Sequence, residues 1–175
     1  MKSEDKLKLF IDNSSIKKRV REIAKRLDKD YKGKTPLFLG ILNGSFIFLS
    51  DLVRQLKTGV RIDFLSLSSY GQNKSSSGNV RIMNDFKCEI EGKDVVVVED
   101  IIDSGNSIKY IKEHIERFNP RSLEFVTLLL KKRTDNYKLK IKYIGFKIPD
   151  KFIVGYGLDY AEKYRNLKSI YFLKN

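Results

Sequence analysis

The sequence predicts an α/β fold with a mostly parallel central sheet flanked by helices. Short, nearly continuous apolar runs recur along the chain, helical patterns lie between them, and several runs end in polar segments that contain glycine or serine. Continuous apolar strands are typical of parallel sheets that helices cover on both faces. The 175 residues, of which 41% are hydrophobic, are enough for one domain with a sizeable core.

Strand-like and helix-like segments alternate along most of the chain. Apolar residues at helical spacing predict a first helix over residues 14–29, with Ser14 as its cap. A later helix, with Phe118 on its apolar face, should stop at Pro120, because proline interrupts a helix. The other expected elements are a strand over Pro36–Leu42, a helix from Gly44, a strand from Val60, a strand over Asp94–Val98, a helix from Ile108 to the stop before Pro120, and a strand over Leu123–Leu130.

The last forty residues alternate more weakly between apolar and polar positions. Ile141–Phe146 and Phe152–Tyr156 carry this weak pattern and predict a smaller β-rich piece appended to the main sheet. The stretch that follows Gly71 is polar and predicts a loop.

The charge is concentrated at the two ends of the chain. Residues 1–35 carry 12 basic and 6 acidic groups, a net charge of +6, and residues 131–175 carry 12 and 4, a net charge of +8. A basic balance favours nucleic acid, anionic lipid or a multiply phosphorylated metabolite as partner. Lysines on solvated helix faces would explain it equally well, so charge does not choose among these.

Composition also indicates the compartment. The single cysteine, Cys88, excludes an intrachain disulfide, and the first residues lack the apolar segment of a signal peptide. No apolar run approaches the roughly 20 residues that span a bilayer. We therefore expect a cytoplasmic protein without a membrane partner.

The strongest candidate site follows the predicted strand over 94–98. Ser104–Ser107 lie where this strand becomes a helix, and Gly105 permits a tight turn whose free N–H groups could receive a phosphate. Glu99, Asp100 and Asp103 precede the turn, and their carboxylates would repel a phosphate unless a divalent cation or sugar hydroxyls intervene. The pattern is neither a Walker A loop nor a dinucleotide fingerprint, and it suits a sugar with a terminal phosphate. A capped turn with solvated acids is the alternative.

Residues 95–107 resemble the 5-phosphoribosyl 1-diphosphate signature of type I phosphoribosyltransferases. Further segments, in the same order and spacing, resemble the hypoxanthine (hypoxanthine-guanine) phosphoribosyltransferase branch. These segments are Leu42–Phe46, Ser68–Gly71, Leu129–Lys131, Ile148–Tyr160 and Tyr164-Arg165. The resemblance implies a single domain over 1–175, with a core of about 36–135 and a small hood formed by the chain ends, from about 1–15 and 136–175.

The resemblance also implies an activity. The chain would transfer the 5-phosphoribosyl group from 5-phosphoribosyl 1-diphosphate to N9 of hypoxanthine, and of guanine, giving IMP or GMP and pyrophosphate in purine salvage. Mg²⁺ is the implied cofactor, and a homo-oligomer, dimer or tetramer, the implied assembly.

The resemblance assigns the phosphoribosyl diphosphate site. Asp103 matches the general base or acid at purine N7. Ser104, Gly105, Asn106 and Ser107, with Asp103, match the loop that binds the 5′-phosphate. The diphosphate side comprises the loop of Leu42, Asn43 and Gly44, in which the family often has a non-proline cis peptide, and the contact from Arg165. Glu99 and Asp100 match the pair that holds the ribose hydroxyls, partly through Mg²⁺.

The purine site is implied in the same way. Lys131 matches the donor to the 6-oxo oxygen, with its neighbour Lys132 as the alternative, and Phe152 matches the aromatic ring that stacks on the base. Ile153 would meet the base edge with its backbone. Asp159 matches the ligand of a second Mg²⁺, and Ser69 and Tyr70 begin the segment that matches the mobile lid over 70–80.

Two other functions stay open at this point. The basic chain ends would suit an RNA-binding regulator built on the same fold, although the acidic site positions are all present and no aromatic-rich basic RNA motif is found. We therefore expect no nucleic-acid partner. Transfer to another base, xanthine or a pyrimidine, is the nearer alternative. Asn43 departs from the family, which often has Arg or Lys there, so one positive contact is missing.

Overall fold

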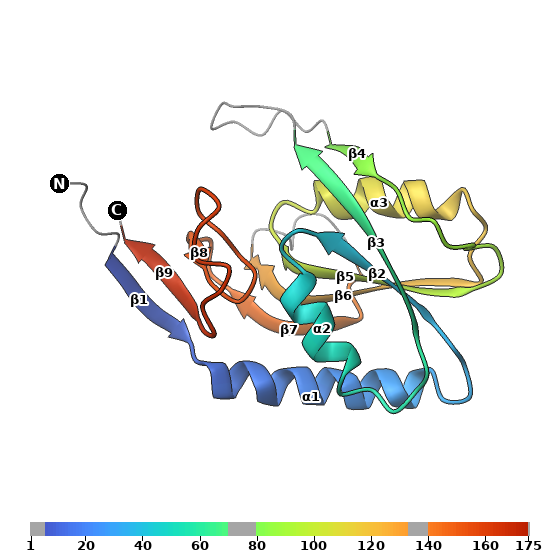
Figure 1. Cartoon of the computed structure of the whole chain (residues 1–175), viewed down its shortest axis with the longest axis horizontal. Helices are drawn as coiled ribbons and strands as arrows, with labels where there is room; N and C mark the ends of the chain where they lie inside the picture. Colours follow the sequence, from blue (N-terminus) through green and yellow to red (C-terminus); the bar gives the residue numbers. More distant parts are fainter. Residues whose placement is uncertain (1–5, 70–79, 133–139, 175) are drawn as a thin grey trace.

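The computed structural model of the chain describes residues 6–69, 80–132 and 140–174. Its centre is a six-stranded sheet with strand order β4-β3-β2-β5-β6-β7 (Figure 1). Only β4 runs antiparallel to its neighbour, so the predicted mostly parallel sheet is confirmed. The strands are β2 (Leu37–Leu42), β3 (Arg61–Ser69), β4 (Val80–Asn84), β5 (Asp94–Ile102), β6 (Ser122–Lys131) and β7 (Tyr143–Ile148).

Helices cover both faces of this sheet. Helices α1 (Asn13–Asp30) and α2 (Phe46–Val53) lie on one face, and α3 (Asn106–Glu116) lies on the other (Figure 1). Alternate residues of a strand point to opposite faces. Val96 and Val98 of β5 accordingly pack into the core with α1 and α2, while Val95 and Val97 pack into the core with α3. Two apolar cores thus hold the central strand in place.

The parallel register brings the carboxyl ends of the strands to one edge. Ile102 at the end of β5 pairs with Leu130 of β6, and Lys131, the last residue of β6, pairs with Ile148 at the end of β7. Open α/β sheets bind ligands at this edge. The carboxyl ends of β2, β5 and β6 therefore meet there.

Both chain ends contribute to a second, small sheet. Strand β9 (Ile170–Lys174) lies between β1 (Lys6–Ile11) and β8 (Ile153–Val154), and it is antiparallel to both. The two described ends of the chain lie close together at this sheet (Figure 1). This is the small hood that the sequence predicted.

Some expectations are wrong in detail. Ile141–Phe146 was expected in the appended piece, but β7 is an edge strand of the main sheet, where it pairs with the buried strand β6. Asp12, not Ser14, caps α1, and its carboxylate accepts the Ser15 N–H at 2.9 Å.

Two further details differ from the expectations. The stretch expected as a polar loop after Gly71 contains β4. Phe118 lies beyond the end of α3 and is 41% exposed, packed edge-on against Phe86. Among the described residues, no helix is both long and apolar enough to cross a membrane.

Candidate active site

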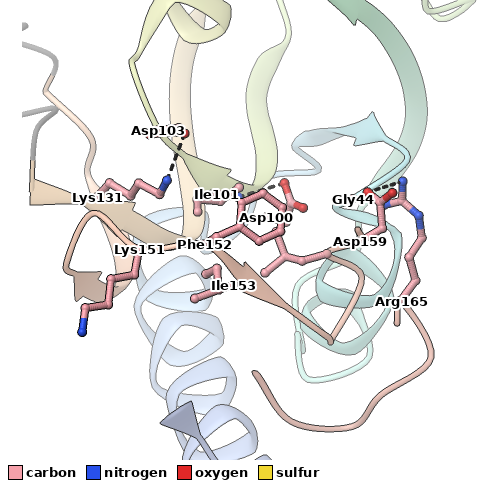
Figure 2. A pocket seen from close by; sticks show the side chains of 11 residues that line it. Gly44, Asp100, Ile101, Asp103, Lys131, Lys151, Phe152, Ile153, Asp159 and Arg165 are labelled. Atoms are coloured by element: carbon pink, nitrogen blue, oxygen red, sulfur yellow. Dashed lines mark hydrogen bonds and ion pairs between the residues drawn. The ribbon is translucent and has the colours of Figure 1, made fainter. Parts of the chain in front are cut away.

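A cavity of about 320 Å³ opens at the carboxyl edge of the main sheet, beneath the small sheet (Figure 2). It brings together residues that lie up to 121 positions apart, from Gly44 to Arg165. Its lining combines three carboxylates, three cations and an exposed aromatic ring. The lining residues are Gly44, Asp100, Ile101, Asp103, Lys131, Lys151, Phe152, Ile153, Leu158, Asp159 and Arg165.

Lys131 lines the cavity as the last residue of the buried strand β6. Its ammonium lies 3.1 Å from Oδ2 of Asp103 and 3.2 Å from Oδ1 of Asp150. Only 8% of Lys131 is exposed, so its position is set by the strand and by these two carboxylates. The neighbouring Lys132 is exposed to solvent and is not among the lining residues. Lys131, not Lys132, is therefore placed to contact a ligand in the cavity.

An aromatic ring and a backbone edge face this ammonium across the cavity. Phe152 is 53% exposed, which is unusual for phenylalanine, and its ring meets Tyr160 edge-on with centroids 5.6 Å apart. Ile153 follows in β8 and is nearly buried, which fixes the backbone beside the ring. An open ring face next to fixed backbone groups can hold a flat heterocycle.

The two acidic residues at the end of β5 sit in contrasting surroundings. Asp100 lines the cavity and is 7% exposed, and burial raises the pKa of its carboxyl to about 6 although the Ile101 N–H donates to it at 2.8 Å. Burial, and after it the charge of Asp100, raise the pKa of Glu99 well above its ordinary value. Within the described part of the chain, the buried Oε2 of Glu99 has no hydrogen-bond partner. Arg165 lowers the pKa of Asp100, but burial outweighs this effect, so both acids would gain from a further positive charge beside them.

The backbone of the loop after β2 packs closely against the side chain of Asp100. The Leu42–Asn43 peptide is cis, as the resemblance implied. A Cβ atom on Gly44 would lie 1.9 Å from Oδ2 of Asp100, so only glycine allows this approach. Ser45 then turns the chain into α2, and its buried hydroxyl donates to the Ile41 carbonyl at 2.7 Å. Asn43 itself is exposed.

The predicted phosphate loop lies at the amino end of α3. Gly105 has φ +80° at the helix N-cap, and Lys109 N–H donates back to its carbonyl at 3.0 Å. The first N–H groups of a helix have no intrahelical acceptor and point outward, which favours an anion. Ser104 and Ser107 are half-buried beside them. Residues 104–107 adjoin the cavity through Asp103 but do not line it.

The opposite wall of the cavity carries an ion pair. Arg165 donates to Oδ1 of Asp159 at 2.7 Å and to the Gly157 carbonyl at 2.7 Å. The second oxygen of Asp159 accepts the Glu162 N–H at 2.9 Å. Both side chains line the cavity, so a cation and a carboxylate face the same space from this side (Figure 2).

The acidic residues suit a hard cation only together with ligand oxygens. Among the described residues, no group of three His, Cys, Asp or Glu side chains could hold a metal ion by itself. Glu99, Asp100 and Asp159 are thus not gathered into one ligand set. The unpartnered Oε2 of Glu99 and the buried Asp100 nevertheless fit Mg²⁺, which typically takes one or two carboxylates and completes its shell with water and phosphate oxygens.

Eight of the predicted site residues line the cavity: Gly44, Asp100, Asp103, Lys131, Phe152, Ile153, Asp159 and Arg165. Leu42, Asn43, Glu99 and residues 104–107 are not among the lining residues. The lid expected over 70–80, with Tyr70, lies outside the described residues, as does the side chain of Ser69. The prediction missed Ile101, Lys151 and Leu158, although all three lie in segments that carry the resemblance, and it missed Asp150 as a partner of Lys131.

Comparison with known proteins identifies the class of protein. The phosphoribosyl transferase domain family matches residues 10–161, which include every lining residue of the cavity except Arg165. With the parallel sheet, the acidic pair and the glycine turn before α3, this match shows that the chain belongs to that family.

Relatives that match over more than nine-tenths of their own length show to which branch of the family the chain belongs. Hypoxanthine-guanine phosphoribosyltransferases of Dictyostelium discoideum and Bacillus subtilis are 47% and 41% identical to the chain, over 91% and 99% of it and over 91% and 97% of their own lengths. A crystal structure of a hypoxanthine-guanine phosphoribosyltransferase from Bacillus anthracis, with HEPES in its active site, matches with a TM-score of 0.91 and 43% identity, covering 98% of this chain and 100% of that one. Within the family, the chain belongs to the hypoxanthine-guanine branch.

One group of relatives is longer. The bifunctional protein TilS/HprT of Listeria monocytogenes is 42% identical over 95% of this chain, which spans 26% of that protein's length.

Proposed function

We propose that the chain transfers the 5-phosphoribosyl group from 5-phosphoribosyl 1-diphosphate to N9 of hypoxanthine, and of guanine, with release of pyrophosphate. The observation that carries this proposal is the position of Lys131. It ends a buried strand, is held between Asp103 and Asp150, and lines the same cavity as the exposed ring of Phe152. The names of the relatives support the same reaction.

Recognition of the base follows from charge and shape. The Lys131 ammonium carries donors only, so it can bind the 6-oxo oxygen of hypoxanthine or guanine but offers nothing to the 6-amino group of adenine. The Phe152 ring stacks on the base, and the backbone of Ile153 meets its edge. A hydrogen bond from a charged donor is worth ~1.5–3 kcal/mol, which is enough to select 6-oxopurines.

Asp103 handles the proton of the imidazole ring. It follows β5 directly and lies beside Lys131, so its carboxylate can reach N7 of a base whose 6-oxo group is bound by the ammonium. It exchanges a proton with N7 while N9 forms the new bond to C1′ of the ribose and the bond from C1′ to the diphosphate breaks.

The phosphoribosyl group is held at both of its ends. N–H groups and hydroxyls of residues 104–107 bind the 5′-phosphate, and Glu99 and Asp100 accept hydrogen bonds from the ribose hydroxyls. Bound Mg²⁺, held by Asp100 and Glu99 together with substrate oxygens, would neutralise the diphosphate charge that develops at the leaving group.

The diphosphate itself is bound on the opposite side. The backbone after β2, from Leu42 to Gly44, and the guanidinium of Arg165 surround it, and Asp159 orients Arg165. Donors that are fixed before the reaction stabilise charge on the leaving group without reorganising. The basic chain ends, with net charges of +6 and +8, attract this anionic substrate.

The test is direct turnover by the purified chain. With hypoxanthine, 5-phosphoribosyl 1-diphosphate and Mg²⁺, we expect IMP and pyrophosphate in equal amounts, and we expect excess chelator to abolish the reaction. Absence of IMP under these conditions would contradict the proposal, and full activity in chelator would contradict the role of the cation. We further propose that the enzyme is cytoplasmic and that it forms a homo-oligomer. Sedimentation of the purified protein tests the oligomeric state.

A further inference from the structure

A partly buried hydrogen bond joins α2 to the turn that carries one wall of the cavity. The hydroxyl of Tyr156 donates to Oδ2 of Asp51 at 2.7 Å, across 105 positions of sequence. Tyr156 is only 5% exposed, and burial, followed by the hydrogen bond to Asp51, raises its pKa. The hydroxyl therefore keeps its proton at every working pH and always donates.

The backbone of the turn that contains Tyr156 has a conformation that neighbouring contacts must stabilise. Gly155, Tyr156 and Gly157 have φ values of +100°, +53° and +101°. Three successive residues in this region are uncommon, and a bulky residue with positive φ persists only where neighbouring contacts impose it. The Tyr156 N–H donates to the Leu167 carbonyl at 2.8 Å, and the Gly157 N–H donates to the Arg165 carbonyl at 3.0 Å.

The same turn packs directly on the loop after β2. A Cβ atom on Gly157 would lie 2.2 Å from the carbonyl oxygen of Gly44 and 4.0 Å from Cβ of Ile47 in α2. Asp51 lies one helical turn after Ile47, on the same side of α2. Backbone contact at Gly44 and the side-chain bond at Asp51 thus fasten the turn to α2 at two points.

Each partner of this bond is connected to a different binding segment. Helix α2 begins two residues after Gly44, which lines the cavity beside Asp100, and the turn follows shortly after Phe152 and Ile153, which also line the cavity. The Tyr156–Asp51 bond therefore sets the distance between the segment proposed for the diphosphate and the segment proposed for the base.

We propose that Asp51 and Tyr156 are positioning residues that hold these two binding segments in the arrangement both substrates require. The inference rests on the proposed function and adds two residues outside the cavity lining to its machinery. Neither side chain touches the reacting atoms. Without the bond, only a fraction of the molecules has the turn seated on α2, and the apparent affinity for each substrate falls by that same fraction.

The experiment compares Tyr156→Phe with a matched control elsewhere in the fold. Tyr143 is also buried, and its hydroxyl donates to Oδ2 of Asp30 at the same 2.7 Å, but this pair joins α1 to β7 and lies outside the cavity lining. Tyr156→Phe should raise KM about tenfold for both hypoxanthine and 5-phosphoribosyl 1-diphosphate, with kcat within about threefold of the parent. Tyr143→Phe should lower the midpoint of thermal unfolding about as much as Tyr156→Phe does, but it should leave both KM values unchanged.

The acid partners provide a second, independent comparison. Asp51→Asn keeps an acceptor but removes its charge, so it should raise both KM values by a smaller factor than Tyr156→Phe, while Asp30→Asn should leave them unchanged. Equal KM values in the Tyr156 and Tyr143 variants would overturn the inference, as would a loss confined to kcat or to one substrate. If a Tyr156 variant does not fold, the Asp51 comparison decides alone. Failure of the parent protein to form IMP would instead contradict the proposed function.

Discussion

The ammonium of Lys131 lies 3.1 Å from the carboxylate of Asp103. The proposed hydrogen-bond donor to the purine 6-oxo group is thus in contact with the proposed acid–base group. Lys131 ends β6 and Asp103 directly follows the neighbouring parallel strand β5, so the sheet itself fixes their separation. A 6-oxopurine presents its oxygen and its N7 side by side. In the proposed complex, the pair matches two adjacent atoms of the base.

Replacement of Asp103 by asparagine tests its proposed proton transfer. The variant keeps the size of the side chain, so we expect 5-phosphoribosyl 1-diphosphate to bind with nearly unchanged affinity. Turnover should fall by ~10²–10⁴-fold, the usual contribution of a positioned acid–base group. Binding measured by calorimetry and kcat measured in the steady state separate the two effects. A kcat close to that of the parent would remove Asp103 from the mechanism.

Replacement of Lys131 by methionine tests base recognition. The 6-oxo oxygen would lose its charged donor, at a cost of ~1.5–3 kcal/mol, so kcat/KM for hypoxanthine and guanine should fall about ten- to a hundredfold. Lys132→Met is the matched control, because this exposed neighbour does not line the cavity and should behave as the parent. If the loss occurred in the Lys132 variant alone, the purine site would have been placed one residue out of register.

Replacement of Gly44 by alanine tests the close packing of the loop on Asp100. The new Cβ would lie 1.9 Å from Oδ2 of Asp100, so the loop or the carboxylate must move, and a shift of this size typically costs about 10²-fold in kcat/KM. Gly59→Ala is the control, because a Cβ there meets no atom within 4 Å. Similar kinetics for the two variants would show that the approach of Gly44 to Asp100 is not needed for activity.

Asp94 provides a prediction on stability and pH at the edge of the sheet opposite the cavity. Hydrogen bonds from Arg121, and then from Ser122, hold the pKa of this nearly buried carboxyl well below its ordinary value of 3.8. Because the folded protein prefers the ionised form, this contribution to stability is complete above the ordinary pKa and is lost as the pH falls below it.

Replacement of Asp94 by asparagine should therefore lower the midpoint of thermal unfolding by roughly 3–10 °C at pH 7. The difference from the parent should shrink as the pH falls below about 4. The exposed Glu91, replaced by glutamine, is a control that should change little at either pH. A difference that stayed constant with pH would show that the charge of Asp94 contributes nothing.

Local sequence patterns predicted the centre of the fold because its strands are apolar throughout. The runs around Leu39, Val97 and Leu129 are buried on both faces, and burial of this kind is visible in sequence without knowledge of any partner. The strands of the edges could not be placed in the same way. β1 pairs with β9 across more than 150 positions, and β7 alternates like a strand of either sheet. Tertiary pairing alone decides where such strands lie.

In the candidate site, too, some features could be predicted from local sequence and others could not. The acidic pair and the glycine turn at Gly105 are contiguous in sequence, and their chemistry could be inferred from that spacing. The contact between Lys131 and Asp150 could not, because it depends on the parallel pairing of β6 with β7. The hydrogen bond between Tyr156 and Asp51 likewise joins segments that no local pattern relates.

The comparison of four bases under identical conditions tests the central claim most directly. With 5-phosphoribosyl 1-diphosphate and Mg²⁺ held constant, kcat/KM is measured for hypoxanthine, guanine, xanthine and adenine. Hypoxanthine, and with it guanine, should be used efficiently, and adenine should be poorer by at least about tenfold, because its 6-amino group cannot accept from the Lys131 ammonium. Adenine used as well as hypoxanthine, or turnover of none of the four bases, would contradict the account.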